Sequence, residues 1–346
     1  VWFNTGALQK DSIANPNDYD YYSYRLNYNT NLDKVSLNTR VKLNTQFLAG
    51  LYTNKLSLVK SDSKGDNKLT VDFLSLYRVN HNYLINSAWD LRKMNNRIDV
   101  DLERKYDYSY GKGTLNLKLQ TSALGSAYDY NKLILTANNN NKVEKLKIKT
   151  RAYFQLGTGN NWAEESKLVL AGANNEEMMN SKFTRAEGIV SADLMDYDYT
   201  TNYFHSAGGL NLRGYSGYLA PEFNEDGTIA SFNYNGTSGA AFNTEIDFTA
   251  YLPYSIRKNN IASYLFADAG IISNEVLTKE NYKTSFSDLR ADAGIGFTYT
   301  FRNFGPLETV RPLVIRFDMP FFLNRAPASD EDFVQMRWLI GINRAF

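Results

Sequence analysis

The sequence predicts an all-β protein, specifically a transmembrane antiparallel β-barrel of about 16 strands. Its segments alternate apolar with polar residues, most regularly in 34–47, where Val, Leu and Phe oppose Lys, Arg, Asn and Gln. Successive side chains of a strand point to opposite faces, so this pattern gives one apolar face and one charged face. No apolar run approaches about 18 residues, which excludes transmembrane helices. The 25 Tyr and 20 Phe residues suit the boundaries between membrane and water.

Alternating segments recur along the chain, and each is predicted to be a strand. They are 19–29, 34–47, 69–79, 98–102, 115–119, 145–156, 289–301 and 313–319. Turn signals lie at 15–18, 61–68, 95–96, 111–113, 138–141 and 257–260, and the Asn tract at 138–141 is predicted as a polar hairpin turn. A membrane strand needs about 9–11 residues, so with turns and loops the 346 residues suffice for about 16 strands. The alternative is a soluble β-sandwich or β-solenoid with one solvated face.

Residues 1–346 are expected to form a single barrel domain with two long loops, at about 157–203 and 214–238. Five strands are predicted after the second loop, at 239–251, 261–272, 287–301, 311–322 and 333–346. Outer-membrane barrels place long loops outside the cell and short turns in the periplasm. If the loop around residue 214 is external, the fifth strand descends through the membrane. The C-terminus is then periplasmic.

Residues 205–215, HSAGGLNLRGY, hold the strongest functional motif. Gly208, Gly209 and Gly214 permit backbone conformations that other residues rarely adopt. Arg213 offers a planar fork that suits a carboxylate, and a loop entering a barrel interior needs such an anchor. The motif resembles that of the BamA-like superfamily, which contains outer-membrane assembly factors and two-partner-secretion transporters. There a glycine pair precedes an Arg-Gly-aromatic tip, here ending in Tyr215, on a surface loop that enters the barrel before the last five strands.

The resemblance implies partners for Arg213 on the inner wall. Asp268, in the segment FADAG, is the first candidate and Glu245 the second; the alternative is that Arg213 is an ordinary interior charge. The closing segment WLIGINRAF, with Gly341 and Phe346, resembles the aromatic-ended signal read by the outer-membrane assembly machinery. That signal often has a second bulky residue two places before the end, where this chain has Arg344. Before Gly208 the resemblance is only a strand pattern.

The resemblance implies an outer-membrane barrel that inserts or translocates polypeptide, with the arginine loop bracing its interior. Its expected partners are outer-membrane lipid, polypeptide clients, a fused or associated domain, and other subunits of an outer-membrane complex. One alternative is the membrane anchor of an exported zinc aminopeptidase-type enzyme, because residues 168–186 look similar to barrels that follow such domains in Bacteroidota. A second is a passive porin or scaffold barrel. Family members carry periplasmic repeats ahead of the barrel, and what precedes Val1 is left open.

The barrel itself is not expected to be an enzyme or to hold a metal or cofactor. Its two histidines, His81 and His205, are far apart in the sequence, and no HExxH zinc motif is present. The acidic pairs 176–177 and 225–226 are predicted to be solvated loop charges rather than metal ligands. A net charge of +1 gives no strong field for nucleic acid.

Overall fold

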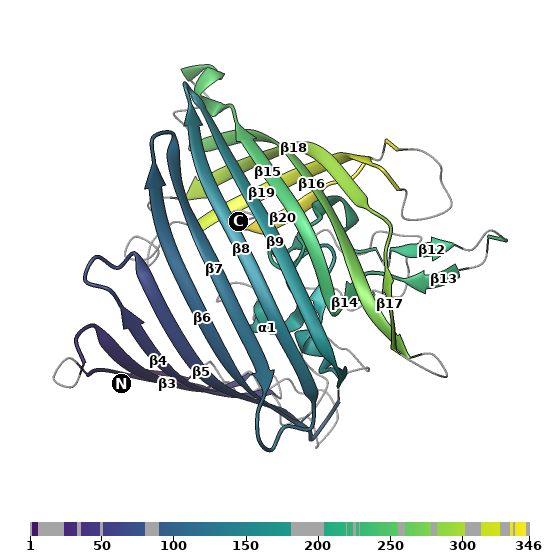
Figure 1. The fold of residues 1–346 in the computed structure, drawn as a ribbon. Helices are drawn as coiled ribbons and strands as arrows, with labels where there is room; N and C mark the ends of the chain where they lie inside the picture. The colour runs from purple at the N-terminus through teal and green to yellow at the C-terminus, as the bar shows by residue number, and fades with distance from the viewer. Residues whose placement is uncertain are drawn as a thin grey trace, which may run out of the picture. The chain divides into compact units, whose positions relative to one another are not determined.

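The computed structural model describes residues 2–5, 24–32, 36–48, 51–79, 90–180, 204–218, 220–223, 226–227, 229–254, 260–277, 282–301, 313–325, 333–334 and 336–343 (Figure 1). Its strands are β1 (Trp2–Thr5), β2 (Tyr24–Asn31), β3 (Thr39–Leu48), β4 (Leu51–Ser61), β5 (Asn67–Arg78), β6 (Met94–Tyr108), β7 (Gly111–Ser122), β8 (Asp129–Val143), β9 (Leu146–Asn161), β10 (Leu168–Val169), β11 (Phe204–His205), β12 (Pro221–Phe223), β13 (Ile229–Phe232), β14 (Asn235–Gly236), β15 (Ser238–Asp247), β16 (Ile261–Leu277), β17 (Tyr282–Phe286), β18 (Arg290–Phe301), β19 (Leu313–Leu323) and β20 (Leu339–Ile342). The helical elements are α1 (Asn175–Asn180) and the 3₁₀ turns η1 (Glu164–Ser166), η2 (Arg213–Tyr215) and η3 (Thr249–Tyr251).

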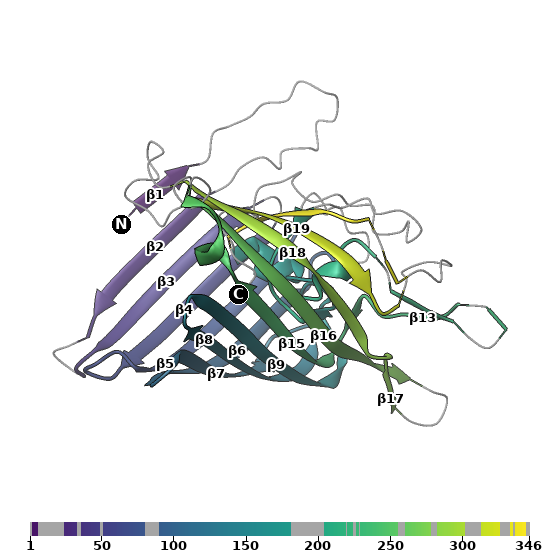
Figure 2. The ribbon, with the colours of Figure 1, turned by 90° about the horizontal axis from the view of Figure 1, so that it is seen from above.

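The chain falls into two compact units. The first contains 1–106, 115–135 and 157–166, and the second contains 107–114, 136–156 and 167–346, so β6 to β9 contribute residues to both. In the first unit β1 to β6 pair in chain order with antiparallel registers. In the second unit β9, β15, β16, β18, β19 and β20 pair in this order, also antiparallel, and Figure 2 shows β15, β16, β18 and β19 in sequence.

The predicted all-β, antiparallel fold class is confirmed. In the part of the chain that the structure describes, sixteen strands join one sheet, of which 14 remain when the two-residue β11 and the hairpin extension β17 are set aside. Within the described ranges no pairing joins β1 to β20, so closure of the sheet into a barrel stays a prediction. No helix in this part of the chain is long and apolar enough to cross a membrane.

The sheet has an apolar face and a polar face, and burial is the reverse of that in a soluble protein. In the first unit one cross-strand row of the apolar face runs Leu43–Leu56–Phe73–Ile98, and all four side chains are exposed. In the second unit Phe242 is 53% exposed and Leu265 is 47% exposed, whereas Asp268 on the polar face is 1% exposed. A soluble protein seldom leaves a contiguous apolar surface of this extent uncovered.

Several predicted turns are wrong, because polar residues sit inside strands. The Asn tract at 138–141 lies within β8, where the Lys142 amide donates to the Tyr110 carbonyl (3.0 Å) and continues the ladder. The chain turns only at Glu144, which has a φ of 53°. Residues 95–96 likewise lie inside β6, and 111–113 begin β7. Strand propensity is a weak preference that ladder pairing and tertiary contacts override.

The strand boundaries also shift. Segments 98–102 and 115–119 are the middles of the longer β6 and β7, while β4 and β8 are strands that the pattern did not single out. β9 continues to Asn161, past the predicted start of a loop at 157. The segment predicted as 239–251 ends as β15 at Asp247, and η3 follows it. The turn signal at 15–18 lies outside the described residues.

Candidate functional site

The residues 204–218 form a folded loop on the polar face of the second unit. Its first residues, β11, pair in parallel with β20, with Phe204 opposite Ile340 and His205 opposite Gly341. The chain then bends at Gly209, which has a φ of 51°, and ends in the η2 turn that contains Arg213. The Leu210 amide donates to the Val169 carbonyl (3.1 Å), so the segment around β10 supports the loop from the other side.

Arg213 is fully buried and is held by two carboxylates of the sheet. Its Nε and Nη2 donate to the two Asp268 oxygens at 2.7 and 3.0 Å, and its Nη1 donates to Glu245 Oε1 at 2.9 Å. The guanidinium also lies 4.0 Å from the ring centroid of Phe266. Burial alone would lower the pKa of Arg213, but the charge of Asp268 and its hydrogen bond outweigh this and hold the pKa well above its usual value. The cation is therefore permanent, and the fork geometry is bidentate.

A polar network extends this anchor along the loop backbone. Asn243, fully buried on β15, donates to the Leu210 and Asn211 carbonyls (both 3.2 Å) and to Asp268 Oδ1 (3.1 Å). Arg151 on β9 donates to Asn243 Oδ1 at 2.9 Å and to the Gly209 carbonyl at 2.7 Å. Buried carbonyls of an irregular segment need such partners, because water does not reach them.

Further arginines hold the tip and the far side of the loop. Arg337, just before β20, donates to the Gly214 and Ser216 carbonyls, and its guanidinium lies 4.0 Å from the ring centroid of Tyr218. Arg290 on β18 donates to the Ala220 carbonyl at 3.0 Å. The loop arginine thus binds sheet carboxylates, whereas Arg337 binds carbonyls of the loop and Arg290 binds a carbonyl just beyond its end.

His205 and Tyr215 make the remaining polar contacts of the motif. Burial, and then the charges of Arg316 and Arg213, lower the pKa of His205 well below its usual value, so the neutral ring can accept a hydrogen bond from Arg316 at Nδ1. The Tyr215 hydroxyl donates to Asn324 Oδ1 at 2.9 Å, after the end of β19. The motif therefore contacts β15, β16, β20 and the end of β19 together.

Sequence reasoning named Arg213, Asp268 and Glu245, and the structure brings these three together. It did not name Arg151, Asn243 or Arg337, because their contacts depend on which rows of distant strands face the loop. The alternation does place Arg151 and Asn243 on the polar faces of their strands, a signal that could have nominated them. Gly341 lies in β20, where an added Cβ would sit 3.0 Å from the His205 carbonyl oxygen. Phe346 and His81 lie outside the described residues.

One residue of the two acidic pairs departs from the prediction of solvated charge. Glu176 is buried in α1, which corrects that prediction, while Glu177 is exposed. The Glu177 carboxylate accepts a hydrogen bond from the Asn174 amide (2.9 Å), and the Glu177 amide donates to Asn174 Oδ1 (2.9 Å). These two reciprocal hydrogen bonds form a capping box at the start of α1. Asp226 is exposed, and Glu225 lies outside the described ranges. In the part of the chain that is described, no three His, Cys, Asp or Glu side chains gather in a way that could hold a metal ion.

Gly214 packs so closely against Asp292 that the position has no room for a Cβ atom. A Cβ there would lie 2.5 Å from Asp292 Cβ and 2.8 Å from its Cγ, and buried wall atoms of β18 have little room to retreat. Gly214→Ala is therefore expected to displace η2 and to destabilise the protein by about 1–3 kcal/mol. Limited proteolysis in detergent should then cleave the 204–218 loop faster.

The control is Gly65→Ala in the β4–β5 turn, where no atom lies within 4 Å of the added Cβ. Its φ of 75° adds local strain but no clash, so it should leave cleavage of the loop unchanged. Equal cleavage rates for Gly214→Ala and the unmodified chain would show that the close packing of η2 on β18 is dispensable.

Two solved structures are similar to this chain. The crystal structure of BamA from Haemophilus ducreyi lacking POTRA domains 1–3 aligns with a TM-score of 0.46 at 13% identity, over 92% of this chain and 67% of that one. CdiB from Escherichia coli aligns with a TM-score of 0.45 at 15% identity, over 92% of this chain and 49% of that one. This chain therefore spans about half the length of the CdiB chain. No protein-family model matches the chain, and no curated protein matches it.

Proposed function

We propose that this chain is an outer-membrane barrel of the BamA-like kind, which inserts or translocates polypeptide. The observation that carries the proposal is the Arg213 loop, anchored through buried carboxylates and backbone contacts on the polar face of the sheet. A loop with this motif in this position, before the five wall strands β15, β16, β18, β19 and β20, is the feature that the family resemblance rests on.

The reversed burial of the two faces supports a membrane location. Leu43, Leu56, Phe73 and Ile98 form an uncovered apolar row, and hydrocarbon is the environment that stabilises such a row. Arg213 and its partners are buried on the polar face of the sheet and do not contact that hydrocarbon, as expected for the interior of a membrane barrel. Closure of the sheet around the loop is part of the proposal.

The orientation in the membrane follows from the lengths of the connections. Two-residue turns join β6 to β7 and β8 to β9, at 109–110 and 144–145, and the long connection from β9 to β15 begins at the opposite end of the strands. One short connection, 49–50 between β3 and β4, shares the end of the long connection. Outer-membrane barrels place their long loops outside the cell, so β9, which runs toward the long connection, ascends and the antiparallel β15 descends. Counting on through β16, β18, β19 and β20, we propose that the C-terminus lies in the periplasm.

The loop is proposed to brace the interior and to control the edge of β20. β11 occupies the hydrogen-bonding edge of β20, and Arg337 ties the loop tip to the residues just before β20. An exposed strand edge can pair with an incoming extended chain. Release of β11 would free an edge for a polypeptide client, while the Arg213 anchor keeps the rest of the loop in place.

The barrel itself is proposed to have no catalytic role. The membrane anchor of an exported peptidase and the passive scaffold are then outcomes of the functional test. An open, unobstructed pore fits the structure less well, because the loop and its arginines occupy the polar face of the second unit.

Reconstitution into liposomes tests the proposal directly. An unfolded outer-membrane barrel client is diluted into liposomes with or without this chain, and its folding is followed by the mobility of unheated samples on SDS gels. We expect faster client folding with the chain than in empty liposomes of the same lipid. Equal rates in both would reject polypeptide insertion and leave the anchor or scaffold role.

A further inference from the structure

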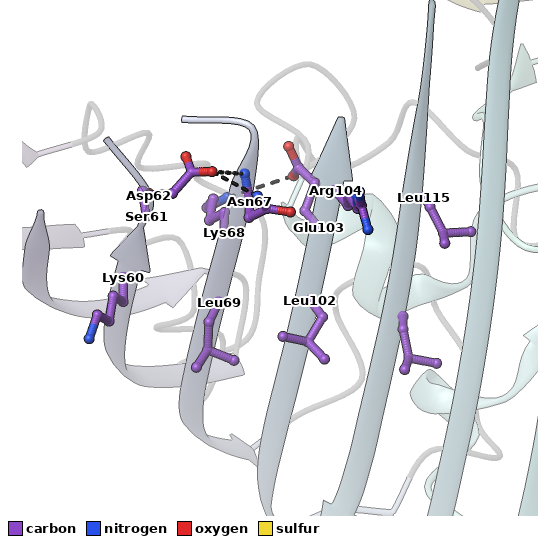
Figure 3. Close-up of a pocket in the computed structure, with 11 residues that line it drawn as sticks. Lys60, Ser61, Asp62, Asn67, Lys68, Leu69, Leu102, Glu103, Arg104 and Leu115 are labelled. Atoms are coloured by element: carbon purple, nitrogen blue, oxygen red, sulfur yellow. Dashed lines mark hydrogen bonds and ion pairs between the residues drawn. The ribbon is translucent and has the colours of Figure 1, made fainter. Parts of the chain in front are cut away.

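A groove opens on the apolar face of the first unit, at the end of β4 to β7 (Figure 3). Its volume is about 510 Å³, and leucines from three neighbouring strands form much of its floor. Leu69, Leu102 and Leu115 are 37%, 46% and 40% exposed. Figure 3 shows them one after another across β5, β6 and β7.

Two cations stand on this same apolar face. Lys60 is opposite Leu69, which is in turn opposite Leu102, so all three share one cross-strand row. Arg104 lies two residues beyond Leu102 on β6, opposite Asn67, in the next row toward the β4–β5 turn. Strands are about 4.8 Å apart, so Lys60 and Arg104 are separated by about 10 Å across the sheet.

The position of these two charges is unusual for this sheet. Among the described residues of β3 to β7, Lys60 and Arg104 are the only cations at apolar-face positions; the others lie on the polar face. Long basic side chains at the border of an apolar surface lay their stems on it and extend their charge toward the headgroup level.

The acidic side chains around the groove are engaged elsewhere. Asp62 accepts hydrogen bonds from the Asp66 amide (2.8 Å), the Asn67 amide (3.1 Å) and Asn67 Nδ2 (2.7 Å) within the turn. Glu103, on the polar face of β6, lies 3.9 Å from Lys68 Nζ and 4.0 Å from Lys105 Nζ. Neither of these carboxylates binds Lys60 or Arg104 in these contacts.

We propose that this groove binds an anionic phospholipid, with acyl chains along Leu69, Leu102 and Leu115 and the phosphate between Lys60 and Arg104. The inference rests on the proposed membrane location. It deepens that proposal by naming a lipid class and a leaflet, because the short β4–β5 turn at 62–66 belongs to the periplasmic end of the strands. The lipid therefore comes from the periplasmic leaflet, where the bilayer's phosphate groups meet these cations.

Native mass spectrometry of the intact chain tests this inference. The chain is reconstituted with equal amounts of phosphatidylglycerol and phosphatidylcholine, and the ratio of retained adducts is measured. We expect the unmodified chain to retain phosphatidylglycerol preferentially. The double variant Lys60→Ala/Arg104→Ala should lower that preference about 10- to 30-fold, since each cation near an anionic surface changes binding about fivefold.

The matched control is Lys64→Ala/Lys112→Ala, which removes two exposed cations at the same end of the strands but not from the groove. It should keep the preference of the unmodified chain. An unchanged ratio in Lys60→Ala/Arg104→Ala, or an equal fall in the control, would overturn the inference. Flotation with liposomes distinguishes failure of the proposed membrane location from failure of the lipid site. A chain that does not float refutes the membrane location and the lipid site with it. A chain that floats but shows no lipid preference refutes only the lipid site.

Discussion

Arg213→Ala is expected to destabilise the folded protein by about 3–5 kcal/mol, the largest loss among single substitutions in the loop. The change leaves Asp268 and Glu245 buried without their cation. Asp268 also lies directly opposite the buried Asp292 on the neighbouring strand, and a second carboxyl group at this position disfavours the charge that Arg213 stabilises. Removal of one member of a buried pair is costly because the other charge has already lost its water.

Unfolding in detergent measures this prediction, through the temperature at which unheated gel mobility is lost and through urea titration. Arg213→Lys should fall between the unmodified chain and Arg213→Ala, because it keeps the charge but not the two-point contact with Asp268. The control is Arg40→Ala on β3, an exposed arginine whose loss should change stability by less than about 0.5 kcal/mol. If Arg213→Ala unfolds together with the control, the buried ion pair contributes nothing to the brace.

The sequence predicted the fold class and the anchor of the loop for different reasons. The fold class follows from the period-two alternation of apolar and polar residues. This pattern is local, so it indicates strands even where the predicted strand boundaries are wrong. The contact of Arg213 with Asp268 and Glu245 is between residues 55 and 32 positions apart in the chain, and only the resemblance to a known motif suggested it. Their role in function stays a prediction.

The contacts that were missed depend on register, which the alternation does not determine. A slip of two residues keeps every side chain on its face but moves Arg151 away from the Gly209 carbonyl. In the first unit the contacts of Ser166, a fully buried residue, depend on register in the same way. Its hydroxyl lies 3.3 Å from the Tyr130 hydroxyl and 3.3 Å from Asn95 Nδ2, and its carbonyl accepts a hydrogen bond from Lys132 Nζ at 3.1 Å. No sequence pattern in 157–166 indicates that this segment contacts β6 and β8.

A disulfide between β11 and β20 is expected to abolish client folding while leaving the protein folded. The chain contains no cysteine, so Phe204→Cys/Ile340→Cys introduces only the intended pair. The two residues are directly opposite in the parallel register, where the Cα separation suits a disulfide. If β11 has to leave the β20 edge for a client to reach it, oxidation should reduce the rate to that of empty liposomes.

Reduction of the disulfide should restore the rate, which separates locking from damage by the substitutions. Phe242→Cys/Ala269→Cys provides a matched lock within the wall, because these residues pair between β15 and β16 in a ladder that has no reason to open. Oxidation of that pair should leave client folding unchanged. Full activity of the oxidised β11–β20 lock would mean that this contact is permanent, and that any polypeptide is handled away from the β20 edge.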